Sequence, residues 1–350
     1  MVEAVKLLGS SKAIGPRHPC FFIAEAGVNH NGDMDRARAL IDAAVAADAD
    51  AVKFQSFRAE ATVTAAAPRA GYQVETIGAG DQFSMLRALE LSFPQQTALK
   101  EYCDARGIMF LSTPYDELSA EFLAGLGVAA LKIASTDTTN VAFLRRVSTL
   151  GRPLLLSTGM CSLGEVAQAV EAAAASPGLV LLHCVSSYPA MEEEANLRAI
   201  RRMQDSFDCP VGYSDHITGN DVALWAVAAG AACIEKHFTL DRSLPGPDHR
   251  ASMEPDEMTA LIAQLRRLER ALGDGNKRVM PGERANKPVM QKSLVAIRAI
   301  EIGSTLDPAD LQTLRPATGI PANEIDRVVG KRLRRALTAG QIITYNDIDW

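Results

Sequence analysis

Two lysines lie inside apolar segments of the sequence: Lys53 in AVKFQ and Lys132 in AALKIAS. A buried ammonium group without a counter-charge is strongly unfavourable, so each lysine needs an anionic partner. That partner is either an internal carboxylate, such as Glu25 or Glu235, or a bound anionic substrate. Two ammonium groups with nearby hydroxyl and backbone N–H groups would form a site for phosphate and carboxylate groups.

Two histidines end consecutive apolar runs: His216 ends PVGYSDH and His237 lies near the end of ACIEKHF. If these runs are neighbouring strands, the two imidazoles can bind one ion. Nitrogen and oxygen donors without a cysteine cluster favour a divalent ion such as Mn²⁺ or Mg²⁺ with open positions over structural zinc. His30 could also reach the site from GVNHNGD, but turn chemistry explains most of that stretch.

Polar side chains end every one of eight short apolar runs, and many of them are two residues apart. Residues two apart lie on the same face of a strand, so a common centre is implied. A single Ser or Thr at such a place can instead cap a helix. The polar ends are Glu25, Lys53 with Gln55, Ser112 with Thr113, Lys132 with Ser135, Ser157 with Thr158, His183 with Ser186 and Tyr188, Ser214 with His216, and Glu235 with His237.

The eight runs alternate with segments of helical periodicity between residues 20 and 272. Strand and helix alternating eight times over about 250 residues predict a (β/α)8 TIM barrel. A doubly wound sheet is the competing fold, but no G-x-G-x-x-G follows the first run. In such barrels the C-terminal ends of the strands carry the catalytic groups, which explains why apolar runs end in polar residues.

The barrel is predicted to be one of two unequal domains. We expect a catalytic barrel over residues 1–272, a linker over 273–290 and a small domain of short strands over 291–350. The small domain is near the lower size limit for independent folding, so it needs a second surface. Residues 58–82, inserted after the second run, are predicted to form an active-site loop.

Composition excludes several classes of protein. The formal charge of −6 argues against a general nucleic-acid binder, which needs a basic surface. No apolar run approaches the ~18 residues of a membrane span, and the N-terminus lacks the features of a signal peptide. The six cysteines are scattered without a C-x-x-C pair, as expected for reduced core residues. We therefore expect a cytoplasmic protein that binds neither nucleic acid nor membrane.

The order and spacing of the motifs resemble the sialic acid synthase family. The matching motifs are FIAEAGVNHNG, VKFQ, FLSTPYD, KIAS, LLLSTGM, LLHC, GYSDH, IEKHFTLDRSLPGPDH and, near the C-terminus, LRPATGI. The resemblance covers residues 20–350 and implies a TIM barrel followed by an antifreeze-like β-clip (SAF) domain. It also implies that phosphoenolpyruvate condenses with N-acetylmannosamine and water, giving N-acetylneuraminate and phosphate through C–O cleavage.

The resemblance also implies roles for individual residues. Phosphoenolpyruvate would be bound by Lys53, Thr113, Lys132, Ser135, Ser157, Ser186 and Ser214. Gln55, Tyr188, Asp248 and Arg315 would surround the amino sugar, and His216 and His237 would hold Mn²⁺, with Mg²⁺ or Co²⁺ as alternatives. Arg315 would come from the small domain of a partner subunit, which implies a homodimer with exchanged caps.

The residue that handles the attacking water is left open between Glu25 and Asp137. Both are placed near strand ends, where a carboxylate can position or deprotonate water. Family members often have glycine and glutamate after KIAS, whereas Thr136 and Asp137 follow here, which shortens the side chain by one methylene. At the position of Ser186 some relatives carry asparagine.

Other functions remain open from the sequence. A Schiff-base aldolase would use Lys53 or Lys132 as a nucleophilic amine in the same fold. A vestigial barrel would bind a sugar without releasing phosphate. Among acceptors, N-acetylmannosamine is the first expectation, and the diacetamido-trideoxyhexoses of legionaminic or pseudaminic acid synthesis are the alternatives.

Overall fold

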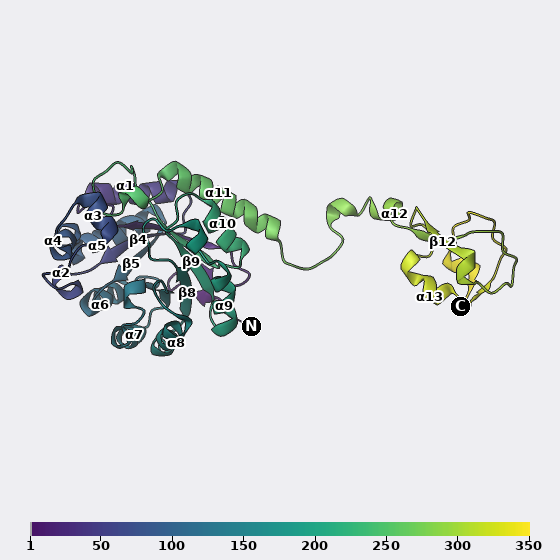
Figure 1. The fold of residues 1–350 in the computed structure, drawn as a ribbon, viewed down its shortest axis with the longest axis horizontal. Helices are drawn as coiled ribbons and strands as arrows, with labels where there is room; N and C mark the ends of the chain where they lie inside the picture. The colour runs from purple at the N-terminus through teal and green to yellow at the C-terminus, as the bar shows by residue number, and fades with distance from the viewer. Residues whose placement is uncertain (1) are drawn as a thin grey trace. The chain divides into compact units, whose positions relative to one another are not determined.

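The computed structural model describes residues 2–350, which form two compact units that divide between Gly273 and Asp274. Figure 1 shows the first unit as a ring of strands surrounded by helices. The second unit is smaller and is built from short strands and turns. No helix in the described part of the chain is long and apolar enough to cross a membrane.

Eight parallel strands form the centre of the first unit, in the order β5-β4-β3-β10-β9-β8-β7-β6. The outermost strands of this order, β5 and β6, also lie next to each other, so the sheet curls into a nearly closed barrel. The predicted (β/α)8 fold is confirmed. The strands are β3 (Phe21–Gly27), β4 (Ala51–Ser56), β5 (Met109–Pro114), β6 (Leu131–Ile133), β7 (Leu154–Ser157), β8 (Leu179–Cys184), β9 (Val211–Asp215) and β10 (Cys233–His237).

Alternating side chains of the strands fill two separate cores. Phe22 and Ala24 of β3 pack outward against the helices, whereas Phe21 and Ile23 pack inside the barrel. This period of two is the pattern that a strand buried on both faces requires. A hairpin of β1 (Val5–Lys6) and β2 (Ala13–Ile14) adds Ile14 to the inner core.

The surrounding helices begin and end where the sequence provides capping residues. Asp33 caps α1 by accepting from the backbone N–H groups of residues 35 and 36, and Gly107 and Gly127 end α5 and α6 in the left-handed conformation. The helices are α1 (Met34–Ala46), α5 (Phe93–Arg106), α6 (Glu117–Leu126), α7 (Val141–Ser148), α8 (Leu163–Ala172), α9 (Arg198–Ser206), α10 (Asp221–Ala228) and α11 (Pro255–Leu272).

The insertion after β4 forms short helices rather than an irregular loop. They are α2 (Ala59–Thr62), α3 (Gly71–Ile77) and α4 (Gln82–Leu89). Two contacts join α3 to the loops after β8 and β10. The rings of Tyr72 and Tyr188 lie 5.1 Å apart, and the Thr76 hydroxyl donates to the Pro247 carbonyl at 3.5 Å. The insertion therefore covers the C-terminal side of the barrel.

The second unit, residues 274–350, has an apolar core of its own. Strand β11 (Ser293–Ala296) pairs antiparallel with β12 (Leu311–Leu314), and β13 (Arg332–Leu333) pairs antiparallel with β14 (Ile348–Asp349). Two single-turn helices, α12 (Lys287–Met290) and α13 (Ile325–Val328), accompany them. The buried core includes Leu294, Ile300, Leu306, Ile320, Val328, Leu337, Ile343 and Ile348.

Candidate active site

A cavity of about 530 Å³ lies at the C-terminal ends of the barrel strands. All of the predicted site residues except Arg315 line it: Glu25, Lys53, Gln55, Thr113, Lys132, Ser135, Asp137, Ser157, Ser186, Tyr188, Ser214, His216, His237 and Asp248. Arg315 lies in the second unit, where its Nε donates to the Met290 carbonyl at 2.9 Å. The structure thus brings together side chains more than 200 positions apart in the sequence.

The register of the strands explains why the central charges meet. The parallel ladders pair Glu25 of β3 with Lys53 of β4 on one side and with His237 of β10 on the other. The ladder between β9 and β10 likewise pairs Ser214 with Glu235. Because paired residues of neighbouring strands face the same side of the sheet, these side chains all point into the cavity.

The two lysines share a network of buried carboxylates and hydroxyls. Lys53 Nζ lies 2.7 Å from Glu25 Oε2 and donates to Thr113 Oγ1 at 2.9 Å. Lys132 Nζ donates to Ser157 Oγ at 2.6 Å. Glu235 lies between the lysines, 3.6 Å from Lys53 and 3.5 Å from Lys132. Each ammonium group therefore has the internal carboxylate partner that the sequence left open, and the cavity beside it still leaves room for a ligand.

The two carboxyl groups of this network have pKa values shifted in opposite directions. Burial raises the pKa of Glu25 well above its usual range, despite the neighbouring Lys53. Burial alone would also raise the pKa of Glu235, but Lys132 and Lys53 hold it below the usual range. When Glu25 is protonated, two ammonium groups face one carboxylate, which leaves a positive charge for an anionic ligand.

The hydroxyl groups beside Lys132 are packed closely around the turn that follows β7. Gly159 donates its backbone N–H to Ser135 Oγ at 2.9 Å. A side chain at Gly159 would place Cβ 2.9 Å from Ser135 Oγ and even closer to the Ser186 hydroxyl. Only glycine permits this approach, so the turn holds two hydroxyls and a backbone donor next to Lys132.

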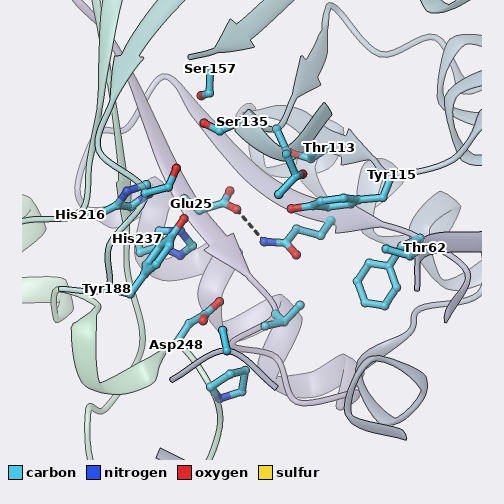
Figure 2. Close-up of a pocket in the computed structure, with 18 of the residues that line it drawn as sticks. Glu25, Thr62, Thr113, Tyr115, Ser135, Ser157, Tyr188, His216, His237 and Asp248 are labelled. Atoms are coloured by element: carbon cyan, nitrogen blue, oxygen red, sulfur yellow. Dashed lines mark hydrogen bonds between the residues drawn. The ribbon is translucent and has the colours of Figure 1, made fainter. Parts of the chain in front are cut away.

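The two histidines point toward each other across the ends of β9 and β10, with ring centroids 5.5 Å apart (Figure 2). His216 Nδ1 donates to the Val185 carbonyl at 2.8 Å, which leaves Nε2 as the free nitrogen of a neutral ring. Buried His237 Nδ1 has no hydrogen-bond partner among the described residues. Burial lowers the pKa of His237 far below its ordinary value, which favours the neutral ring that a metal ion requires.

These nitrogen donors fit a divalent ion that keeps positions open. Within residues 2–350 no group of three His, Cys, Asp or Glu side chains is arranged to hold a metal. The protein would therefore supply two nitrogen ligands and leave the remaining positions to water or substrate, as in catalytic rather than structural sites. A carbonyl acceptor on the second ring nitrogen, as at His216, is typical of metal-binding histidines.

Three further polar side chains surround the space in front of the histidines. Gln55 Nε2 donates to Glu25 Oε1 at 3.3 Å, and the Tyr188 ring lies 4.2 Å from that of His216 (Figure 2). The Asp248 carboxylate accepts no hydrogen bond from the described chain, and burial raises its pKa to about 6. On the side of β6, burial also raises the pKa of Asp137, which accepts from Asn140 Nδ2 at 3.3 Å.

The expectation that all polar strand ends share one centre is wrong for three residues, His183, Ser112 and Thr158. His183 points away from the cavity, where its Nε2 lies 2.8 Å from the Ala195 carbonyl, because its neighbours Leu182 and Cys184 face inward. Ser112 Oγ bonds to Ser56 Oγ at 2.7 Å, outside the cavity. The Thr158 hydroxyl donates to the Leu182 carbonyl. His30 also lies outside, and its Nδ1 accepts from Gly32 N at 2.9 Å, in agreement with turn chemistry.

Sequence reasoning missed the side chains that line the cavity on the side away from His216 and His237. They come from the end of β4, the loop after β5 and the insertion helices: Phe57, Thr62, Tyr72, Met85, Leu86, Leu89 and Tyr115. Tyr115 belongs to the motif FLSTPYD and could have been found from its place directly after a strand. The apolar residues gave no comparable signal, since nothing local distinguishes them from core residues.

Comparison with known proteins agrees with this geometry. Residues 40–277 match the model of the NeuB family and residues 291–349 match the SAF domain. The N,N'-diacetyllegionaminic acid synthase of Legionella pneumophila is 43% identical, with 99% of this chain and 98% of the relative covered. The enzyme of that name from Campylobacter jejuni is 42% identical, with 88% and 94% covered.

A solved structure is similar over most of the chain. The N-acetylneuraminic acid synthetase of Leptospira borgpetersenii is 36% identical and superimposes with a TM-score of 0.72, over 82% of this chain and 95% of that chain. The predicted resemblance and the prediction of an enzyme are confirmed. The chain therefore belongs to the NeuB family of nonulosonic acid synthases and carries a C-terminal SAF domain.

Proposed function

We propose that this enzyme condenses phosphoenolpyruvate with a diacetamido-trideoxyhexose to form a legionaminic acid and phosphate. The sequence led us to expect N-acetylmannosamine, with this acceptor as an alternative. Two relatives named for legionaminic acid are more similar to the chain than the solved sialic acid synthetase is, which supports the alternative. Pseudaminic acid synthesis, which uses a related acceptor, is the next candidate.

The observation that carries the proposal is the arrangement of cations and hydroxyls around one cavity. Phosphoenolpyruvate carries a phosphate and a carboxylate close together, and two buried ammonium groups with hydroxyls at 2.6 and 2.9 Å offer matching donors. We assign its binding to Lys53, Thr113, Lys132, Ser135, Ser157, Ser186 and Ser214. Asp248, whose carboxylate lacks a partner in the described chain, would accept from a hydroxyl of the sugar.

The proposed reaction joins C3 of phosphoenolpyruvate to the aldehyde carbon of the open-chain sugar. Positive charge that develops at C2 is captured by water, and the tetrahedral intermediate expels phosphate by cleavage of the C2–O bond. Glu25 or Asp137 would take the proton of that water, since both carboxyl groups face the cavity and burial raises the pKa of each, which strengthens it as a base. Lys53 and Lys132 would hold the departing phosphate.

The metal site and the dimer are parts of the same proposal. His216 and His237 would hold a divalent ion, Mn²⁺ or alternatively Mg²⁺ or Co²⁺, which supplies Lewis-acid chemistry at the carbonyl group of the acceptor. Arg315 is exposed in the second unit, and within that unit its guanidinium bonds only to a backbone carbonyl among the described residues. We propose that it enters the cavity of a partner subunit in a homodimer.

Phosphate release with three acceptors tests the proposal. We expect the diacetamido-trideoxyhexose of legionaminic acid synthesis to exceed N-acetylmannosamine in kcat/KM by at least about tenfold, with the pseudaminic acceptor also slower. A chelator should abolish turnover and Mn²⁺ should restore it. Oxygen label placed in the bridging position of phosphoenolpyruvate should appear in the released phosphate.

Two controls separate this proposal from its rivals. Lys132→Met removes one ammonium group while Glu235 keeps Lys53 and the Ser214 hydroxyl, so this variant should fold but lose phosphate release. Borohydride with pyruvate should leave no covalent adduct. An adduct together with full activity in chelator would establish a Schiff-base aldolase, and a preference for N-acetylmannosamine would return the enzyme to sialic acid synthesis.

A further inference from the structure

The cavity has an apolar wall that the proposed chemistry does not use. Its members line the cavity and form an apolar cluster separate from both barrel cores: Val28, Phe57, Met85 and Leu89, with Leu86 and Tyr115 packed against them. Charged and polar side chains line the part of the cavity at the strand ends. A ligand that fills the cavity therefore meets charged groups at the strand ends and, at this cluster, carbon atoms beside a few polar side chains of the insertion such as Gln73 and Gln82.

Helix α4 supplies the centre of this wall. Met85 and Leu89 are four residues apart, so they lie on one face of the helix, and they are only 7% and 8% exposed. Since both line the cavity, the surface that they retain faces it. Asp81 caps the helix by accepting from the backbone N–H of Ser84 at 2.6 Å, and Glu90 at its end pairs with Arg58 at 2.8 Å. These contacts fix the wall in place.

The wall lies across the cavity from the histidines. Figure 2 shows His216 and His237 on one side, Thr62 and Tyr115 on the opposite side, and Glu25 between them. The Thr62 hydroxyl donates to the Arg58 carbonyl at 2.9 Å, and the Tyr115 hydroxyl points toward the centre of the cavity. The rings of Tyr115 and Phe57 pack edge to face, with their centroids 6.2 Å apart. Phe57, Met85 and Leu89 thus offer carbon surface on this side of the cavity, whose lining also includes the polar residues Gln82 and Tyr115.

We infer that Phe57, Met85 and Leu89 form a subsite that selects acceptors lacking the hydroxyl at C6. This inference rests on the proposed function, in which the carbonyl end of the sugar lies beside the histidines. The distal carbons then extend toward α4, where a C6 methyl group buries against the wall. A hydroxymethyl group would lose water against Phe57, Met85 and Leu89, whose side chains carry no N–H or O–H group to replace it.

A matched pair of sugars isolates this contact. N-acetylmannosamine and its 6-deoxy analogue differ only in the C6 oxygen, so the ratio of their kcat/KM values measures the subsite alone. We expect the wild-type enzyme to prefer the 6-deoxy sugar about 10- to 100-fold, the range in which apolar pockets reject an added hydroxyl. Met85→Gln places an amide of similar size in the wall and should bring the ratio close to one.

Three further variants control for packing. Met85→Leu keeps the wall apolar and should keep the wild-type ratio. Arg87→Gln places the same amide on the exposed side of α4, where it disturbs only the surface pair with Glu60, and should also keep it. Leu89→Gln tests the wall at a second position, in case Met85→Gln fails to fold in a thermal unfolding experiment.

The outcomes separate the subsite from the proposed function. A wild-type ratio near one, or folded glutamine variants at both wall positions that retain the wild-type ratio, would overturn the subsite. A strong 6-deoxy preference that is lost in these variants would establish it. If that holds while the diacetamido-trideoxyhexose reacts no faster than N-acetylmannosamine, the subsite stands and the proposed acceptor is wrong.

Discussion

Asp248 differs from the buried carboxylates Glu25 and Glu235 in having no ion pair and no hydrogen-bond donor in the described chain. Glu25 and Glu235 share the two lysines, whereas the Asp248 carboxylate accepts no hydrogen bond from the described chain. Burial of a carboxyl group without such partners disfavours its charged form, and its pKa is accordingly raised to about 6. A carboxyl group that is shielded from water without a partner lowers the stability of the fold, so we expect it to bind a ligand.

The first prediction concerns replacement of this carboxylate by an amide. Asp248→Asn should raise KM for the amino sugar by about 10- to 100-fold, because an amide oxygen is a weaker acceptor than a carboxylate. KM for phosphoenolpyruvate should change little, since the lysine network is untouched. Steady-state kinetics with each substrate varied in turn measure the two effects.

Stability provides the control for this variant. No bond to the described chain is lost in Asp248→Asn, and a poorly solvated charge is removed, so the thermal midpoint should stay the same or rise. A lower midpoint, or equal changes in KM for both substrates, would show that Asp248 supports the fold of the site and does not bind the sugar.

Alternate residues of strands β9 and β10 point to opposite faces of the sheet. Ser214, His216, Glu235 and His237 point into the cavity, whereas the intervening Asp215 and Lys236 point outward and are paired in the ladder. Lys236 Nζ lies 2.5 Å from Asp215 Oδ2 and also donates to the Ile217 carbonyl. This buried ion pair joins the two strand ends that carry the histidines.

The second prediction concerns this outward-facing pair. Lys236→Met should lower the free energy of unfolding by about 3–5 kcal/mol, because it leaves the Asp215 carboxylate buried without a cation. The double variant Asp215→Asn with Lys236→Met should recover at least about 1 kcal/mol of this loss. Denaturant unfolding of the single and double variants gives both values, and a double variant no more stable than Lys236→Met would exclude the explanation.

The strands and the inward-facing residues were predictable from the sequence because both depend on short-range alternation. The run FFIAEAG is β3 residue for residue, and parity correctly paired Lys53 with Gln55 and Ser214 with His216. His183 was misplaced because polarity at a strand end says nothing about parity. The apolar wall was invisible, since Met85 enters the cavity through the packing of an insertion whose helices no local signal revealed.

The third prediction concerns a turn of the second unit and its pH dependence. Asp347 is fully buried and accepts from the backbone N–H and the hydroxyl of Thr344 at 2.7 and 2.8 Å. Burial alone would raise the pKa of Asp347, but these bonds and Arg335 hold it below the usual value. The unfolded chain therefore binds a proton at higher pH than the folded chain does.

The stabilisation by Asp347 is consequently complete above pH ~4, the pKa of an unperturbed aspartate, and is lost as the pH falls below it. Asp347→Asn should lower the free energy of unfolding of the second unit at pH 7. Between pH 5 and 3 this free energy should then fall less in the variant than in the wild-type protein. In a Trp225→Phe background, the fluorescence of Trp350 reports on this unit alone, because the chain has two tryptophans. A parent and variant with the same pH dependence would contradict the assignment.

At the scale of the whole molecule, the two units have separate apolar cores, and the cavity is built from the first unit alone. Arg315 is exposed in the second unit, where it completes no structure beyond one bond to a backbone carbonyl. If the second unit of one subunit caps the cavity of its partner, then defects in the two units belong to different sites of a dimer. That arrangement can be tested without a structure of the complex.

The fourth prediction is complementation between two inactive variants. Arg315→Ala and Lys132→Met should each lose most activity alone, since the first removes the cap residue and the second an ammonium group of the cavity. Unfolding and refolding the two together yields mixed dimers, in which one site carries both defects and the other carries neither. By random pairing, about a quarter of wild-type activity should return. If Arg315 instead served the cavity of its own chain, every site in a mixed dimer would keep one defect, and mixing would restore nothing.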